Sequence, residues 1–420
     1  MNETTQDLAD FISASPSPYH AVAEVVRRLG AEGFTEQVES QPWGTAPGGR
    51  YLVRDGTVLA WYVGENVAPG APFRIFAAHT DSPTLKVKPH PDGGAAGWRQ
   101  ANVEVYGGAL WNSWLDRDLG LAGRLALLDG TVVPVHVDRP LLRVPQLAVH
   151  LDRQVNSEGL KLDPQRHLLP VWGLGRPAEG DLIRFLAGQA GVDAEAVAAH
   201  DLTVHDLTAP ATLGQDDELF AGPRLDNQAS VHSGLTALIR AARQNPSTIP
   251  VFVGFDHEEI GSDSATGAAG PLLEQVLTRL AGGLEERYRS FALSRCLSVD
   301  VTQAAHPNYL ERHEPDHLVF VNGGPALKVN ANQRYATDAP GAAAWYRACA
   351  EVNVPSQVFV SRNTMPCGST VGPILSTRLG IRTVDVGMPI LSMHSSRELC
   401  GVDDPARVID AATAFLVDAS

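Results

Sequence analysis

The chain has 420 residues, of which 44% are hydrophobic and 19% are charged. This length suggests two domains, and the composition is ordinary for a globular enzyme with an ample core. The net charge of −15 argues against a phosphate-binding nucleic-acid surface. No stretch approaches the roughly 20 apolar residues of a membrane span, so we expect neither nucleic-acid nor membrane partners.

The N-terminal part of the chain predicts two short helices and a sheet. Residues 6–13 and 19–29 follow helical spacing on either side of S-P-S-P. Residues 51–63 read as a hairpin, because Asp55-Gly56 interrupts an apolar-rich run. Residues 73–78 then form an apolar strand that leads to His79.

Beyond residue 88 the pattern changes to short strand-like segments. These lie at 101–107, 123–138 and 170–175, with one helix at about 180–190. We therefore predict that residues 89–215 form an inserted, mainly β domain.

After Gly222 helices and strands alternate again. Helices are expected at 227–243, 267–283, 339–352, 369–380 and 404–419, and strands at 251–256, 296–300 and 382–387. This alternation predicts an α/β fold with a doubly wound mixed sheet, built from residues 1–88 and 216–420. We expect this discontinuous unit to be catalytic.

Acidic and imidazole groups follow most of the apolar runs. They are His79, Asp226, Glu258, Glu259, Asp300 and His394. Open α/β sheets gather residues from strand ends into one crevice, and two histidines with several carboxylates there suggest a two-metal hydrolytic centre.

Most of these groups have a plainer interpretation when taken singly. His79 and Asp81 face the same side of an extended strand, so Asp81 could orient the His79 ring, or both could be a polar strand end. Asp226 would serve as a helix cap, and His394 as a loop histidine. Asp300 ends an apolar strand, where an unpaired charge costs free energy.

The Glu258-Glu259 pair is the most specific feature. Two adjacent buried glutamates repel each other without a cation, so we interpret Glu259 as a metal ligand and Glu258 as the general base. The alternative is two exposed acids at a helix start. The order His, Asp, Glu-Glu, Asp, His at successive strand ends favours the metal centre.

Long motifs across the chain resemble the aspartyl aminopeptidase family of co-catalytic dizinc exopeptidases. They include HTDSP, YGGALW, PQLAVHLDR, RLDN, DHEEIGS, KVNANQRYAT, MPCGSTVGPILSTRLG and LSMHSSRE. The resemblance implies that Asp226 bridges two metals, with His79 and Asp300 on one and Glu259 and His394 on the other.

The resemblance also implies substrate contacts and a closed tetrahedral dodecamer, assembled through the inserted domain at 89–215. His150 would reach a neighbouring subunit's site, while Lys328 and Tyr335 would contact the substrate. Lysine in a closed pocket favours an acidic first residue. Gln303 stands where the family commonly has histidine, and Thr364 where it commonly has aspartate. Both are expected near the substrate pocket.

We therefore expect a metallo-aminopeptidase that removes N-terminal Asp or Glu from peptides. Mixed nitrogen and oxygen ligands suit Zn²⁺, and Mn²⁺ or Co²⁺ also fit such sites. The alternatives are a metal-dependent deacylase or amidohydrolase acting on N-acylated amino acids, or a non-catalytic assembly or cargo protein on the same scaffold. Four scattered cysteines without a C-x-x-C pair, and a start without signal-peptide features, favour a cytoplasmic location.

Overall fold

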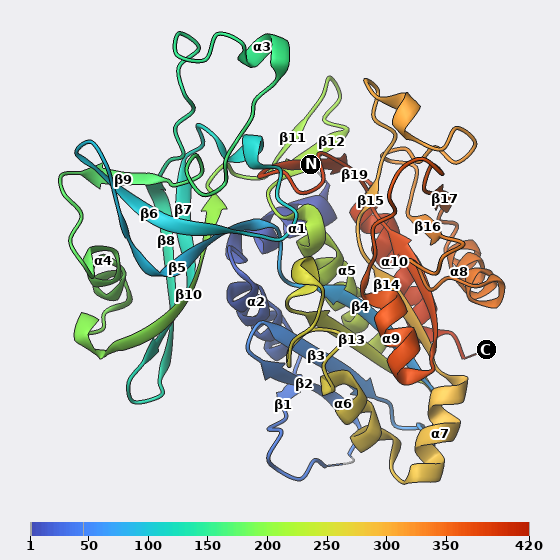
Figure 1. Ribbon diagram of the computed structural model, residues 1–420. Helices are drawn as coiled ribbons and strands as arrows, with labels where there is room; N and C mark the ends of the chain where they lie inside the picture. Colours follow the sequence, from blue (N-terminus) through green and yellow to red (C-terminus); the bar gives the residue numbers. More distant parts are fainter. Residues whose placement is uncertain (1, 45, 420) are drawn as a thin grey trace.

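The computed structural model describes residues 2–44 and 46–419, whose strands form three sheets. The largest is a nine-stranded mixed sheet (Figure 1). In spatial order its strands are β1 Thr35–Glu36, β2 Gly48–Arg54, β3 Thr57–Val63, β13 Ile249–Phe255, β4 Phe73–His79, β14 Arg295–Val299, β18 Arg382–Gly387, β16 Ala326–Val329 and β17 Gln357–Val360.

Helices cover both faces of this sheet, which makes it doubly wound. One face packs against α1 Glu3–Ala14, α2 Pro18–Ala31, α5 Leu225–Ala242, α8 Ala339–Glu351 and α10 Asp404–Val417. The other packs against α6 Leu272–Ala281, α7 Leu284–Leu293 and α9 Val371–Leu379. Strand β4 shows the alternation that this requires, because Phe76 and Ala78 enter the first core while Ile75 and Ala77 enter the second.

The middle of the sheet is parallel, and this fixes where the polar residues meet. β13 pairs with β4, β4 with β14, and β14 with β18, all in parallel register. Their carboxyl ends therefore lie at one edge of the sheet. His79 ends β4, Glu258 and Glu259 follow β13, and Asp300 follows β14.

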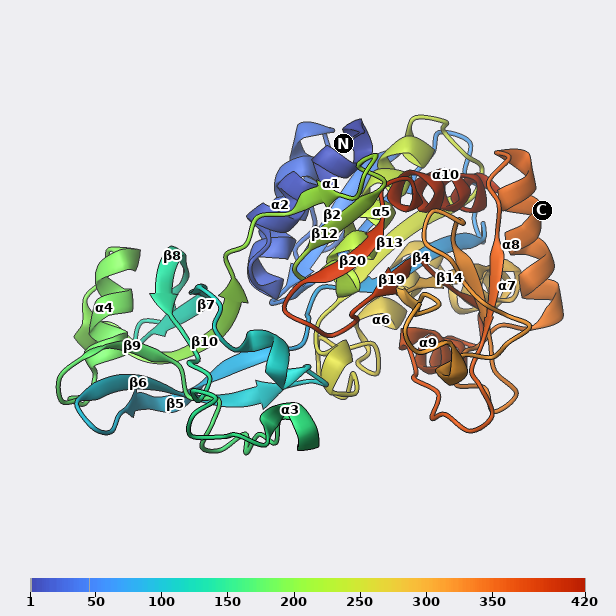
Figure 2. The same cartoon turned by 90° about the horizontal axis from the view of Figure 1, so that it is seen from above.

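The second sheet has six strands and a core of its own (Figure 2). Its strands are β8 Val132–Leu142, β7 Leu119–Leu127, β10 Val197–Asp206, β5 Thr84–Gly93, β6 Trp98–Tyr106 and β9 Val171–Leu174, accompanied by α3 Val155–Glu158 and α4 Asp181–Ala190. We call this sheet with α3 and α4 the inserted domain. The α/β fold with an inserted β domain is confirmed, while the exact limits at residues 88 and 216 stay a prediction.

A third sheet joins distant parts of the chain beside the edge that carries the polar residues. Its strands are β11 Ala211–Leu213, β12 Leu219–Gly222, β20 Glu398–Gly401, β19 Pro389–Leu391 and β15 Thr302–Gln303. Within residues 2–44 and 46–419, none of the helices has the length and apolar character needed to cross a membrane.

Some sequence-based elements need correction. The helix expected from residue 267 begins only at Leu272, because residues 267–270 form a tight turn whose glycines lie against the carbonyls of Ser262 and Ser264. The sequence pattern did not predict α7, which follows directly after the Gly282-Gly283 break. Strands β5 and β10 were also missed, although both pair along most of the second sheet.

Candidate metal centre and substrate cavity

The first half of the candidate centre gathers around His79. Its Nε2 atom lies 3.3 Å from Asp226 Oδ1 and 3.5 Å from Asp300 Oδ1. These three residues offer ligand atoms that all lie within 4.8 Å of one another. Because His79 and Asp300 stand at the ends of neighbouring parallel strands, the sheet itself sets their separation.

The second half gathers around His394 and shares Asp226 with the first. His394 Nε2 lies 3.2 Å from Asp226 Oδ2 and 3.5 Å from Glu259 Oε2. These side chains form another group of ligand atoms within 4.8 Å. Each oxygen of Asp226 therefore faces a different histidine, as expected for a bridging carboxylate.

Asp226 stands at the start of α5, but its side chain does not serve as a helix cap. Although α5 begins at Leu225, Asp226 and Asn227 have non-helical backbone angles, and the peptide bond between them is cis. The Asp226 side chain is 4% exposed and points to the two histidines. The helix-cap interpretation of this residue is therefore wrong.

Asp81 binds the backbone that carries the glutamate pair. Its carboxylate accepts hydrogen bonds from the backbone N–H groups of Glu258 and Glu259, both at 3.1 Å, and from the Tyr106 hydroxyl at 2.8 Å. The Nδ1 atom of His79 lies 3.1 Å from the Asp81 carbonyl oxygen and 3.4 Å from its Oδ1. These contacts orient His79 so that Nε2 faces Asp226.

Glu398 is a site residue that the sequence reasoning missed. It is 2% exposed in β20, and its two oxygens accept from the backbone N–H groups of Asp226 at 2.9 Å and His394 at 2.7 Å. It thereby ties together two of the three candidate ligands of the second half, Asp226 and His394. The available signal was an acid placed four residues after His394, just before the short apolar strand Leu399-Cys400.

The cluster carries more carboxylates than its two histidines can balance, and this indicates whether the site suits bound cations. Asp226 Oδ1 and Glu259 Oε1 are buried, and no hydrogen-bond partner for either lies in the described part of the chain. Burial and the nearby carboxylates raise the pKa of Glu258 to about 8 and the pKa of Glu259 well above its ordinary value. Bound cations would offset both effects, so the donor set fits divalent metal ions.

A cavity of about 240 Å³ opens in front of these groups. Gln303, Lys328 and Tyr335 line it together with all the candidate ligands and Glu258. Lys328 is 3% exposed and donates from Nζ to the Val301 carbonyl oxygen at 2.7 Å, with its ammonium 5.3 Å from the Tyr335 ring centre. A neighbouring cavity of about 440 Å³ shares Gln303, Phe359 and other wall residues, so the space continues outward.

Two expected residues lie elsewhere. Thr364 is exposed and accepts a hydrogen bond from Arg362, which lines the outer cavity of about 440 Å³. It is not part of the wall of the 240 Å³ cavity, and its influence on the substrate stays a prediction. His150 is exposed in a loop of the inserted domain and does not line its own chain's cavity.

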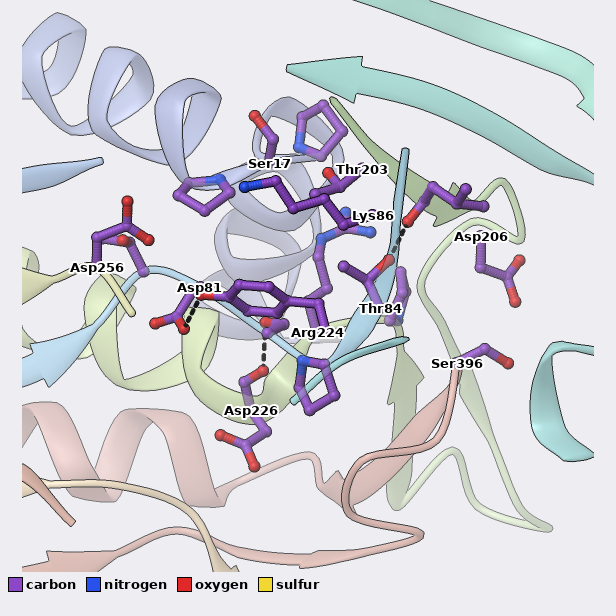
Figure 3. A pocket seen from close by; sticks show the side chains of 18 of the residues that line it. Ser17, Asp81, Thr84, Lys86, Thr203, Asp206, Arg224, Asp226, Asp256 and Ser396 are labelled. Carbon is purple, nitrogen blue, oxygen red and sulfur yellow. Dashed lines mark hydrogen bonds between the residues drawn. The ribbon is translucent and has the colours of Figure 1, made fainter. Parts of the chain in front are cut away.

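A small cavity of about 50 Å³ also borders the centre at Asp226 (Figure 3). Its wall combines residues of the catalytic part, namely Ser17, Asp81, Asp226 and Asp256, with Lys86 and Thr203 of the second sheet. The candidate metal centre therefore lies directly at the junction of the two domains.

A parallel sheet edge that gathers two histidines and several carboxylates around an open cavity is typical of metal-dependent hydrolases. Comparison with known proteins narrows this class. The family model for aminopeptidase I zinc metalloproteases, peptidase family M18, matches residues 11–416.

Individual relatives are similar to this protein over nearly its whole chain. A probable M18 family aminopeptidase 2 from Streptomyces avermitilis is 57% identical over 419 residues, covering 98% of this chain and 97% of the relative. The solved structure of Ape4 in complex with Nbr1 is similar at 37% identity and a TM-score of 0.95, covering 98% of this chain and 85% of that one. The S. cerevisiae mApe1 dodecamer matches at 27% identity and a TM-score of 0.87, with 98% and 96% coverage.

The chain therefore belongs to peptidase family M18 and is a metal-dependent aminopeptidase.

Proposed function

We propose that this aminopeptidase releases N-terminal Asp and Glu residues from peptides, using two divalent cations and Glu258 as general base. One observation supports the two-cation arrangement above all others. The two oxygens of the Asp226 carboxylate face two different histidines, at 3.3 Å for His79 and 3.2 Å for His394. A carboxylate so placed can bridge two ions.

In this proposal His79, Asp226 and Asp300 hold one cation, and Asp226, Glu259 and His394 hold the other. Zinc is the expected ion because the family is one of zinc metalloproteases, although Mn²⁺ and Co²⁺ suit the same ligands. When bound, the two ions polarise the scissile carbonyl and make water a stronger acid.

Glu258 is the group that moves the proton. Its side chain is 15% exposed and lines the cavity, with Oε2 3.9 Å from His79 Nε2. We assign it the role of taking a proton from the attacking water as the new C–O bond forms. It then passes that proton to the leaving amine as the C–N bond breaks, so no other proton donor is required.

Lys328 supports the acidic preference. An ammonium has three N–H donors, and the contact with Val301 accounts for one of them. Because this side chain is nearly closed off from solvent, a carboxylate of the substrate's first residue would interact with it more strongly than in water. Tyr335 forms the adjacent wall, and Gln303 lies at the passage to the outer cavity.

We also propose a homo-oligomer, of dodecameric form as described for S. cerevisiae mApe1. The loop that carries His150 exposes Leu147, Val149 and Leu151 by 58%, 50% and 76%. Neighbouring exposed apolar side chains are typical of protein interfaces, which supports the expected contact of His150 with another subunit. The four free thiols support a reducing, cytoplasmic location.

The test is hydrolysis of Asp-, Glu- and Leu-anilides by the full-length protein, with and without a chelator. We expect chelator-sensitive turnover that is fastest with the acidic substrates. Glu258→Gln should abolish turnover, whereas Glu285→Gln, at an exposed position in the first turn of α7, is the matched control. Equal turnover by Glu258→Gln would refute its role as base.

The alternative functions give different results in the same assay. A deacylase would cleave N-acetylated amino acids and would not need a free amino terminus. A non-catalytic assembly or cargo protein would hydrolyse none of the substrates, and Glu258→Gln would then change nothing. Absence of chelator-sensitive cleavage would refute the proposed function.

A further inference from the structure

We infer that the inserted domain positions the second half of the metal centre through residues 106–113, which are the last residue of β6 and the first part of the connection to β7. This inference rests on the proposed two-cation function. Metal occupancy on the His394 side of the centre depends on how this segment lies against the catalytic part of the chain. The His79 side depends on the large sheet instead.

The first contact fixes the ring of His394. Its Nδ1 atom lies 3.1 Å from the Gly108 carbonyl oxygen, which can only accept a hydrogen bond. Nδ1 must therefore carry the proton, so Nε2 is free to bind a metal ion opposite Asp226 and Glu259. Gly108 belongs to the inserted domain, 286 residues from His394 along the chain.

Further contacts hold the backbone of the His394 turn. Leu110 N–H donates to the His394 carbonyl oxygen at 2.9 Å. Ser113 Oγ accepts from the Ser396 N–H at 2.9 Å, and the Ser396 hydroxyl donates to the Ser113 carbonyl oxygen at 2.7 Å. His394 itself has a φ of 67°, a left-handed conformation that non-glycine residues adopt only when their surroundings hold them in it.

The two segments approach each other so closely that an added Cβ atom would be in tight contact. A Cβ atom on Gly108 would lie 3.0 Å from His394 Nδ1, and one on Gly107 would lie 3.0 Å from Glu259 Cβ. Gly107 also has a φ of 69°. Both protein ligands that belong to the second half alone are therefore in tight contact with residues 107–108.

The first half is oriented differently. His79 Nδ1 lies against the Asp81 carbonyl oxygen, two residues further along the same chain segment. Asp300 follows a strand that pairs directly with β4. The inserted domain reaches this half through the Tyr106 hydroxyl, which binds Asp81 rather than a metal ligand. Displacement of the 106–113 segment should therefore loosen one cation more than the other.

Gly108→Ala in the full-length protein tests this asymmetry. The added methyl group should push the ring of His394 away from its position. The control is Gly188→Ala in α4 of the same domain, where a Cβ would meet nothing within 4 Å. Zinc binding to the metal-free proteins is measured by competition with a chromophoric chelator, together with thermal unfolding of the metal-free forms.

We expect the wild type and Gly188→Ala to bind two equivalents of zinc. Gly108→Ala should keep one equivalent at wild-type affinity and bind the other about 10- to 100-fold more weakly, the range typical for lost ligand support. Ser113→Ala, which removes a hydroxyl without adding bulk, should weaken the same equivalent to a smaller extent. In a His394→Ala background, Gly108→Ala should produce no further loss.

Three outcomes would contradict this picture in different ways. Unchanged affinities in Gly108→Ala and Ser113→Ala would overturn the inference. Equal weakening of both equivalents would also overturn it, because the segment would then have only a general structural role. A wild-type protein that binds a single equivalent would overturn the two-cation function itself, before any variant is compared.

Discussion

Lys328→Met is the most direct test of the proposed acidic selectivity. Lys328 is 3% exposed, lines the cavity beside the candidate ligands and is held by the Val301 carbonyl oxygen at 2.7 Å. Methionine has a similar length and no charge, so the substitution removes the ammonium with little change in volume. It also leaves the Val301 carbonyl oxygen without this partner, which lowers the stability of the folded protein by about 1–3 kcal/mol.

The expected loss of preference for the charged substrate follows from the contact that its carboxylate would make with Lys328. A hydrogen bond to a charged group contributes about 1.5–3 kcal/mol. Each 1.4 kcal/mol corresponds to roughly a tenfold ratio, so the preference for a charged side chain should fall by about 10- to 150-fold. Comparing two substrates on one protein cancels the loss of stability, because both substrates meet the same folded fraction.

The assay measures kcat/KM for Glu- and Gln-p-nitroanilide, which differ by one charge at nearly equal volume. The wild type should favour the Glu substrate. Lys328→Met should lose most of that preference because kcat/KM falls for the Glu substrate and not for the Gln substrate. Lys161→Met is the control, since Lys161 is 78% exposed in the inserted domain. A Glu/Gln ratio that stays at the wild-type value in Lys328→Met would refute the assignment.

Asp81→Asn should lower kcat about 10- to 100-fold with little change in KM. The carboxylate oxygens of Asp81 accept from the Glu258 and Glu259 N–H groups, and the substitution replaces one of these oxygens by an NH₂ group that can only donate. Steady-state kinetics and the zinc content of the variant measure the effect. Burial lowers the pKa of His20 to about 4, so its contribution to stability is complete above pH 6.5 and disappears as the pH falls toward 4. Through His20 the wild type should lose about 2 kcal/mol of unfolding free energy between pH 8 and pH 5. Urea unfolding of His20→Gln should show a shallower decline of this free energy with falling pH. Parallel declines in the variant and the wild type would disprove the assignment. Zinc at 100 times its Kd should stabilise the metal-free protein by about 2.7 kcal/mol per site, and an unchanged Tm on adding zinc would count against a resident metal.

The sequence allowed the candidate ligands near the ends of the central strands to be predicted because their geometry follows from local patterns. Apolar runs identify β4, β13 and β14 as buried strands, and a polar residue directly after each run marks a strand end. Once the three strands are parallel neighbours, their ends meet without further information. His79, Glu259 and Asp300 are of this kind.

The supporting residues could not be predicted in the same way. Gly108 acts through a backbone carbonyl, which every residue possesses, so its identity carries no sign of the role. Glu398 binds two backbone N–H groups that approach it only after the third sheet has formed. Tyr106 looks like an ordinary strand residue until β6 meets Asp81. The sequence places these residues in elements but does not indicate which elements touch.

His394 shows what this difference means for the enzyme. It does not stand at the end of a central parallel strand; it lies beyond β19, in the turn before β20. Its N–H is bound by Glu398, its carbonyl oxygen by Leu110 and its ring by Gly108. Two of these three contacts come from the inserted domain. In the proposed two-cation centre, a force that shifts this domain, such as packing against another subunit, would therefore act most strongly on His394, while the sheet keeps His79 and Asp300 in place. The proposed subunit assembly and the proposed occupancy of the second metal position would then be linked through His394.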